Sequence, residues 1–122
     1  MSLSDVVEHE LLQDFVTRYS ALYLAASTTD PGEDGSGITE PGDPVYVRAT
    51  VGATTLTGSN LTNDSPVVFV TASQVWGSIA YIAVFSALSG GIYLGRAEIA
   101  PLIIGQNCRI IIPSGTPIVS MD

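Results

Sequence analysis

The first residues of the chain carry apolar side chains at every fourth position, and acidic residues occupy much of the remaining surface of the same segment. Because an α-helix turns once in about 3.6 residues, this spacing places the apolar side chains on one face. The pattern predicts an amphipathic helix over residues 3–19, capped at its N-terminus by Ser2. The apolar positions, called the helix stripe below, are Leu3, Val7, Leu11 and Phe15.

After residue 19 the pattern changes to short apolar runs separated by Gly, Pro, Asn and Ser. Runs of this length and composition are typical of β-strands. Their regular spacing predicts a mainly β fold, a jelly-roll-like β-sandwich preceded by the helix. We therefore expect a helical arm at 1–19 and a β-sandwich domain at 20–122. The expected strands cover residues 20–28, 45–51, 54–57, 67–71, 79–85, 92–98, 102–104, 109–112 and 117–120.

Residues 76–94 give the strongest local signal, that of a hairpin whose turn is Ser89-Gly90-Gly91. Its first strand, residues 79–85, has almost no polar residue, so we expect both of its faces to be covered by another sheet or a neighbouring subunit. The apolar run is much shorter than the roughly 20 residues that span a bilayer. No membrane-spanning segment is predicted.

The chain has 122 residues, enough for one domain with a core of its own. Its net charge of −8 lies entirely in residues 1–43, and it contains no lysine. Phosphate binding normally needs clustered Lys and Arg, so we expect neither a nucleic acid nor a membrane as partner. The N-terminus lacks a basic segment followed by an apolar one, which predicts no signal peptide.

Residues 30–44 consist of turn formers and acids with almost nothing to bury, and they predict a long acidic Gly/Pro loop. Such a loop is either an exposed contact loop or an inter-subunit extension. Carboxylates are ligands that calcium prefers, but the alternating spacing of an EF-hand is missing, so no metal site is expected. The candidate contact residues are Asp30, Glu33, Asp34, Glu40 and Asp43.

Nothing in the sequence indicates catalysis. His9 is the only histidine and has no partner nearby, whereas a catalytic base needs an oriented partner and a nucleophile. The single cysteine, Cys108, lies in an apolar strand-like run and is expected to be buried. We predict that the protein is not an enzyme and has no catalytic residue and no cofactor.

Two further patterns have structural and functional interpretations. Asn60 and Asn63 each begin a glycosylation acceptor triplet, which we interpret as turn chemistry. Tyr81, Phe85 and Tyr93 could form a sugar-binding platform, although their place in the hairpin favours core packing.

Several stretches of the chain together resemble a family of small structural proteins of tailed bacteriophages, labelled tail-fibre-like, minor tail or head-decoration proteins. The resemblance covers most of the chain after residue 20. The stretches that carry it are residues 23–32, which lead into the acidic loop, and 46–48, 76–79, 84–91 and 112–115.

This resemblance implies a non-enzymatic virion protein, assembled in the host cytoplasm, that decorates the capsid or forms part of a head or tail fibre. It also implies a homo-oligomer, in particular a trimer, attached to other virion proteins through one end of the subunit. The helix stripe is the expected assembly interface and the acidic loop a second contact, although the helix could instead simply cover the sheet. The alternative function is a receptor- or carbohydrate-binding module of a tail fibre.

Overall fold

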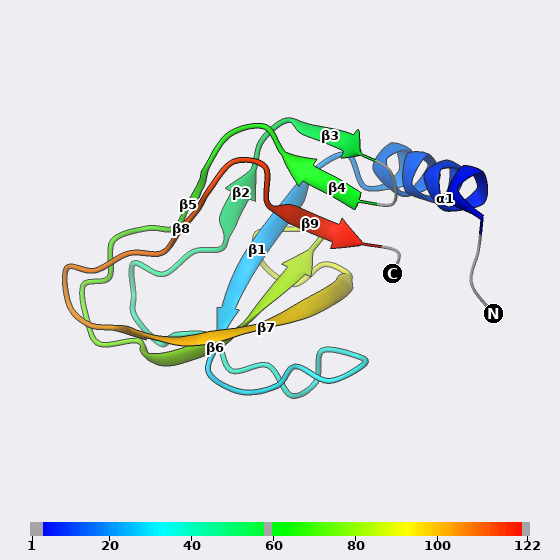
Figure 1. Cartoon of the computed structure of the whole chain (residues 1–122). Coiled ribbons are helices and arrows are strands. Elements are labelled where there is room, and N and C mark those ends of the chain that lie inside the picture. Colours follow the sequence, from blue (N-terminus) through cyan, green and yellow to red (C-terminus); the bar gives the residue numbers. More distant parts are fainter. Residues whose placement is uncertain (1–3, 58–59, 121–122) are drawn as a thin grey trace.

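The computed structural model describes residues 4–57 and 60–120, and in these residues one helix is followed by nine antiparallel β-strands (Figure 1). The predicted mainly β, sandwich-like architecture with an N-terminal helix is confirmed. The elements are α1 (Asp5–Arg18), β1 (Leu22–Ser27), β2 (Ala49–Val51), β3 (Thr54–Thr57), β4 (Asn60–Asn63), β5 (Val67–Val68), β6 (Gly77–Phe85), β7 (Tyr93–Ile104), β8 (Ile111–Ile112) and β9 (Pro117–Ser120).

The strands form three antiparallel sheets around one main core. A four-stranded sheet has the order β2-β1-β6-β7, a three-stranded sheet the order β3-β4-β9, and β5 pairs with β8. Figure 1 shows the three-stranded sheet beside α1, with β6 and β7 on the other side of the molecule. The core between them contains Leu24, Ile82 and Val84 from the larger sheet and Leu61 from β4.

The predicted hairpin of residues 76–94 is present as β6 and β7, which pair antiparallel up to Phe85 and Tyr93. Gly91 in the turn has φ 75°, in the left-handed region where glycine is unstrained. A Cβ at this position would also lie only 2.8 Å from the Cβ of Ala87. The Gly-Gly pair that signalled the turn is therefore required by its geometry.

Both faces of β6 are covered at residues 82–85, as the sequence predicts. Ile82 and Val84 face the main core. Ala83 and Phe85 belong to a second, smaller cluster on the opposite face, which Ile38 of the acidic loop helps to cover. The second cover is thus a segment of the same chain.

The helix begins later than the sequence pattern predicts. Its N-cap is Ser4, whose Oγ accepts a hydrogen bond of 3.3 Å from the backbone N–H of Val7. The expected cap, Ser2, lies outside the described residues. Ser4 satisfies an N–H group that has no partner inside the helix, which is why the helix starts here. Among the described residues, no helix has the length and apolar character needed to cross a membrane.

Two strand predictions are exact, at 54–57 and 117–120, and several others differ from the structure. The expected strands at 92–98 and 102–104 are fused in β7, and those at 45–51, 67–71 and 109–112 are shortened to two or three residues. The strand β4 lies where Asn60 and Asn63 were interpreted as turn chemistry. It was missed because its sequence, NLTN, is rich in turn formers, although both of its edges are paired.

The prediction that Cys108 is buried is wrong, since this cysteine is exposed. It follows a tight turn in which Asn107 has φ 70° and the N–H of Cys108 donates to the carbonyl of Gly105. The apolar run thus begins in the connection between β7 and β8. Within this run Ile110 is buried, whereas Ile111 is 51% exposed.

Candidate assembly surfaces

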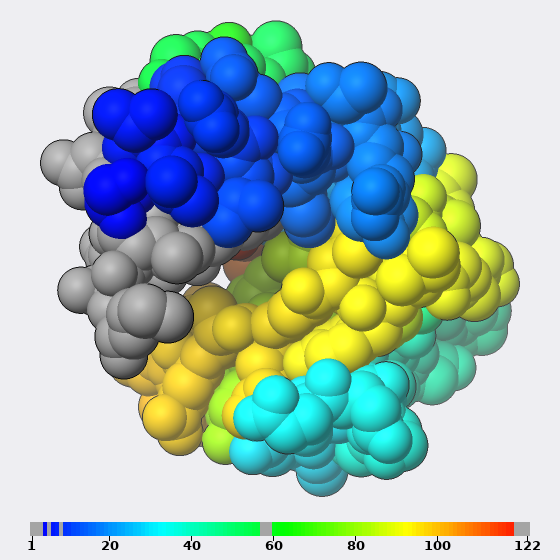
Figure 2. Space-filling model, turned by 90° about the vertical axis from the view of Figure 1, so that its right-hand side faces the viewer, coloured from blue at the N-terminus to red at the C-terminus, as the bar shows by residue number. Residues whose placement is uncertain are grey.

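The helix stripe is divided between the protein's own core and solvent. Leu3 lies outside the described residues. Val7 is 40% exposed and Leu11 is 43% exposed, whereas Phe15 packs against the core, with its ring centroid 5.2 Å from that of Tyr19. Figure 2 shows α1 in blue across one face of the molecule. The exposed part of the stripe is therefore at the N-terminal half of the helix.

A different side of α1 holds it on the domain. Leu12 is 1% exposed, and Val16 packs against the same core. In a helix, residue 12 lies about 100° around the axis from residue 11, so the buried and exposed apolar sides are adjacent. The helix thus covers the core with one side and presents Val7 and Leu11 to solvent on the next.

The acidic loop folds back over the outer face of the four-stranded sheet. Pro31 is fully buried, and Tyr93 Oη donates a hydrogen bond of 2.9 Å to the carbonyl of Gly32. A Cβ at Gly35, which has φ +80°, would lie 2.8 Å from Cγ of Tyr93. The expectation that the loop buries almost nothing is wrong, because Pro31 is buried and Gly35 and Ile38 lie against the hairpin.

The first acids of the loop surround Arg96 of β7. Arg96 Nε lies 2.9 Å from Asp30 Oδ1, and its Nη1 donates to the carbonyl of Gly32 at 2.9 Å. Glu33 is 3.9 Å from the same guanidinium, with a side chain that is 98% exposed. Asp34 accepts from the backbone N–H and the hydroxyl of Ser36, and these hydrogen bonds lower its pKa. Asp30, Glu33 and Asp34 therefore form an exposed acidic tip.

Glu40 is used inside the protein. It accepts from Arg48 at 3.0 Å and 3.1 Å and from the hydroxyl of Tyr46 at 2.7 Å. Burial, helped by this hydrogen bond to a carboxylate, raises the pKa of Tyr46 above its ordinary value. Arg48 lies 3.6 Å above the ring of Phe85 and donates to two carbonyls of the β6–β7 turn. Glu40 and Arg48 together join the loop to the hairpin.

Asp43 closes the loop and is only 6% exposed. Its carboxylate accepts from the backbone N–H groups of Ser73 at 2.7 Å and Gln74 at 3.0 Å, from the Ser73 hydroxyl, and from Trp76 Nε1 at 3.0 Å. Burial alone would raise the pKa of Asp43, but the hydrogen bonds outweigh it and hold the pKa well below its ordinary value. Asp43 is thus an internal anchor.

The hairpin aromatics and the glycosylation triplets also have internal partners. Phe85 is buried, and Tyr93 packs edge-on against it at 5.6 Å. The Asn63 side chain is 1% exposed, donates to the carbonyls of Ser65 and Pro113, and accepts from Thr116. In the structure Phe85 packs in the interior, and the Asn63 side chain holds neighbouring backbone segments together by hydrogen bonds.

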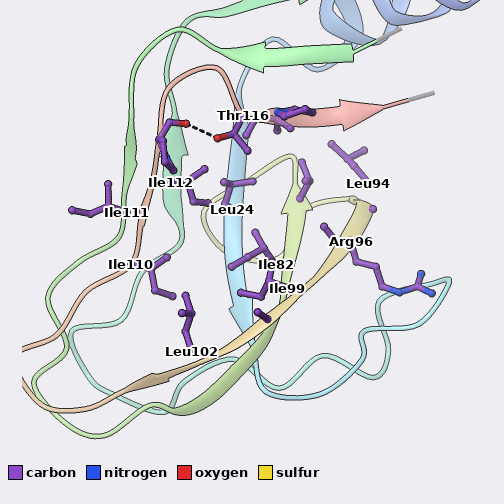
Figure 3. A pocket seen from close by; sticks show the side chains of 17 residues that line it. Leu24, Ile82, Leu94, Arg96, Ile99, Leu102, Ile110, Ile111, Ile112 and Thr116 are labelled. Atoms are coloured by element: carbon purple, nitrogen blue, oxygen red, sulfur yellow. Dashed lines mark hydrogen bonds between the residues drawn. The ribbon is translucent and has the colours of Figure 1, made fainter. Parts of the chain in front are cut away.

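Sequence reasoning missed an apolar groove of about 380 Å³ between β7 and residues 110–118 (Figure 3). Core residues Leu24, Ile82 and Val84 line it from the larger sheet, and among the residues that the structure describes Arg96 is the only charged one in its lining. Figure 3 shows the Arg96 side chain extending away from the groove toward the acidic loop. The signal in the sequence was the run of isoleucine at 110–112, all of which line the groove.

One family model matches the chain, over residues 2–116, and its description is "Podophage GP4 fiber I protein gp80". No curated protein matches the chain. The match covers nearly the whole chain and includes α1, the acidic loop, the hairpin and β8. It confirms the resemblance to structural proteins of tailed phages that the strand and turn motifs indicated. The chain therefore belongs to the podophage GP4 fiber I protein gp80 family.

Proposed function

We propose that this virion fiber protein is non-enzymatic, forms a homo-oligomer, and attaches to other capsid or tail proteins through the exposed side of α1 and the acidic tip. The family match over residues 2–116 carries the proposal that the chain is a structural part of a phage particle. The arrangement of α1 and of the loop supports the choice of contact surfaces.

The helix is suited to contact a second protein while it remains packed on its own domain. Single exposed apolar residues are common on protein surfaces. Val7 and Leu11, however, are successive positions of one stripe and lie beside the buried side of the helix. An amphipathic helix commonly binds by laying such a stripe into an apolar groove of its partner. Docking on a partner would bury Val7 and Leu11, which the domain itself leaves exposed.

The acidic tip is suited to orient this contact. Asp30 and Glu33 share one guanidinium, that of Arg96, so the tip retains net negative charge. Glu40 and Asp43 hold the base of the loop in place from inside. A fixed cluster of negative charge favours a basic patch on a partner, and it contributes more to the association rate and to orientation than to affinity.

Substitutions on the exposed helix side test the proposal without opening the core. Removing residues 1–19 would also remove Leu12, so a truncated protein that fails to assemble could simply be unstable. The double variant Val7→Glu with Leu11→Glu places charge only on the exposed stripe. The control is Val6→Glu, because Val6 is 67% exposed on another side of the same helix.

The readout is the amount of protein on purified phage particles, together with the thermal unfolding midpoint of the isolated protein. We expect incorporation of the double variant to fall at least tenfold, while its thermal unfolding midpoint stays close to that of wild type. The Val6→Glu control should resemble wild type in both incorporation and midpoint. Wild-type incorporation of the double variant would refute the helix contact.

A further inference from the structure

The outer edge of β7 is open. This strand ends the order β2-β1-β6-β7, and within residues 4–57 and 60–120 no strand pairs with its other side. At twelve residues it is the longest strand described. The edge of a sheet presents unpaired N–H and C=O groups that can pair with another chain, and proteins usually protect it with lysine, proline or a bulge.

Protecting features lie towards both ends of this edge. Pro101 lies in the second half, where the pairing with β6 shifts register between Ile79 and Tyr81. A second register shift lies near the start of β7, at Leu94, between Val84 and Phe85 of β6. The first half pairs without interruption from Glu98 to Gly95. Residues 95–98 therefore form a regular edge without a protecting feature.

The apolar groove runs along this same segment of β7. Gly95, Ala97 and Ile99 line it together with the core residues beneath. Figure 2 shows a hollow between α1 in blue and β7 in yellow on this face. A strand added at the edge would cover the groove as well as satisfy the backbone groups, because the two features adjoin.

We propose that β7 pairs with β7 of a second copy of this chain, antiparallel and about a two-fold axis at Ala97. The proposal deepens the homo-oligomer proposed above and rests on it. The pairing extends the four-stranded sheet of each copy into one continuous sheet and joins the two grooves. A two-fold contact yields dimers and even-numbered assemblies, in contrast to the trimer implied by the resemblance.

The charges on β7 select this register. Arg96 and Glu98 lie opposite Ala83 and Tyr81 of β6, on the outer face of the sheet. A two-fold axis at Ala97 places Arg96 of each copy opposite Glu98 of the other. Moving the axis by one residue would place two arginines or two glutamates directly opposite each other, and like charges in that position are destabilising.

The apolar face agrees with the same register. Gly95 and Ala97 pair with Val84 and Ile82 of β6, so they lie on the core side of the sheet. With the axis at Ala97, the small Gly95 is opposite the large Ile99 of the second copy, and Ala97 is opposite Ala97. Small and large side chains thus alternate across the contact, which allows close packing.

Charge reversal on the full chain tests the contact. Glu98→Arg places an arginine opposite Arg96, and Arg96→Glu places a glutamate opposite Glu98, so each variant alone should associate at least tenfold more weakly than wild type. An equimolar mixture of the two restores both opposite-charge pairs. Sedimentation equilibrium and native mass spectrometry should therefore show wild-type dimers, weakened self-association of each variant, and one-to-one heterodimers in the mixture.

A crosslink tests the register without perturbing the charges. Ala97→Cys combined with Cys108→Ser should form an intermolecular disulfide under mild oxidation, because the two positions lie opposite each other across the axis. Gln106→Cys in the same background is the control, since residue 106 is exposed but outside the paired segment. Selective crosslinking at 97 is the expected result.

Three outcomes would overturn the inference: a wild-type protein that stays monomeric, an oligomer that Glu98→Arg leaves unchanged, or equal crosslinking at 97 and 106. An oligomer that is intact in Glu98→Arg would leave the proposed homo-oligomer standing. Attachment to particles is measured separately through Val7 and Leu11, so failure of the β7 contact can be told from failure of the proposed function.

Discussion

Trp76 Nε1 donates a hydrogen bond of 3.0 Å to the carboxylate of Asp43 and so joins the start of the hairpin to the end of the acidic loop. The residues between them in sequence include β2 to β5, so this bond links distant parts of the chain. Asp43 was a candidate contact residue because of its charge. The structure gives that charge a role in fixing the base of the loop instead.

Asp43→Asn should lower stability at neutral pH, since an amide cannot accept all of the hydrogen bonds that the carboxylate accepts. The folded-state pKa of Asp43 is depressed below its ordinary value of 3.8. Its contribution to stability is therefore complete above that value and is lost as the pH falls toward the folded-state pKa. Chemical denaturation between pH 2.5 and 7 should show that the difference in unfolding free energy between variant and wild type narrows below about pH 4. A difference in unfolding free energy that widens on acidification would contradict this role.

Arg48→Met should destabilise the protein by about 3 kcal/mol, because it leaves the carboxylate of Glu40 without its ionic partner in a partly buried site. The change also removes the guanidinium from the ring of Phe85 and from two turn carbonyls. Urea denaturation gives the measurement. The control is Arg109→Met, because Arg109 is exposed and its replacement should cost less than about 0.5 kcal/mol. Equal effects of the two substitutions would show that the buried pair contributes little.

Leu12→Ala and Leu11→Ala should separate the two sides of α1. Leu12 is 1% exposed, so its truncation leaves a cavity and should cost about 3 kcal/mol of unfolding free energy. Leu11 is 43% exposed, and its truncation should cost less than about 0.5 kcal/mol while weakening attachment to particles. The reverse order of the two unfolding free energies would mean that the helix packs by its other side.

Cys108 should react with a thiol reagent in the folded protein. It is exposed at the turn after β7, so the native protein should be labelled nearly as fast as the protein in denaturant, measured at one pH. Labelling that appears only after unfolding would mean that Cys108 is buried, as the sequence pattern predicted. The experiment also shows whether a fluorophore can be placed there without disturbing the core.

The sequence was most informative where structure is local. The hairpin turn depends on Gly90 and Gly91, and both glycines adopt the positive φ that their presence indicates. The helix stripe was also recognisable from its period. What the period could not show is how the stripe is divided, because Phe15 packs against a core that strands much later in the chain supply.

Features that depend on tertiary contacts escaped prediction. β4 forms from poor strand formers because β3 and β9 pair with its two edges. The acidic loop looked entirely solvated, yet the side chains of Glu40 and Asp43 are held by partners from other segments. The groove beside β7 is likewise made by strands that are adjacent only in the folded protein.

The central claim is that this chain is a structural part of the phage particle, and locating it on intact virions tests this most directly. Cryo-electron microscopy of particles decorated with an antibody against the chain should show label on a fiber at defined positions. Particles without label, with the chain found only in the soluble fraction of the infected lysate, would contradict the account.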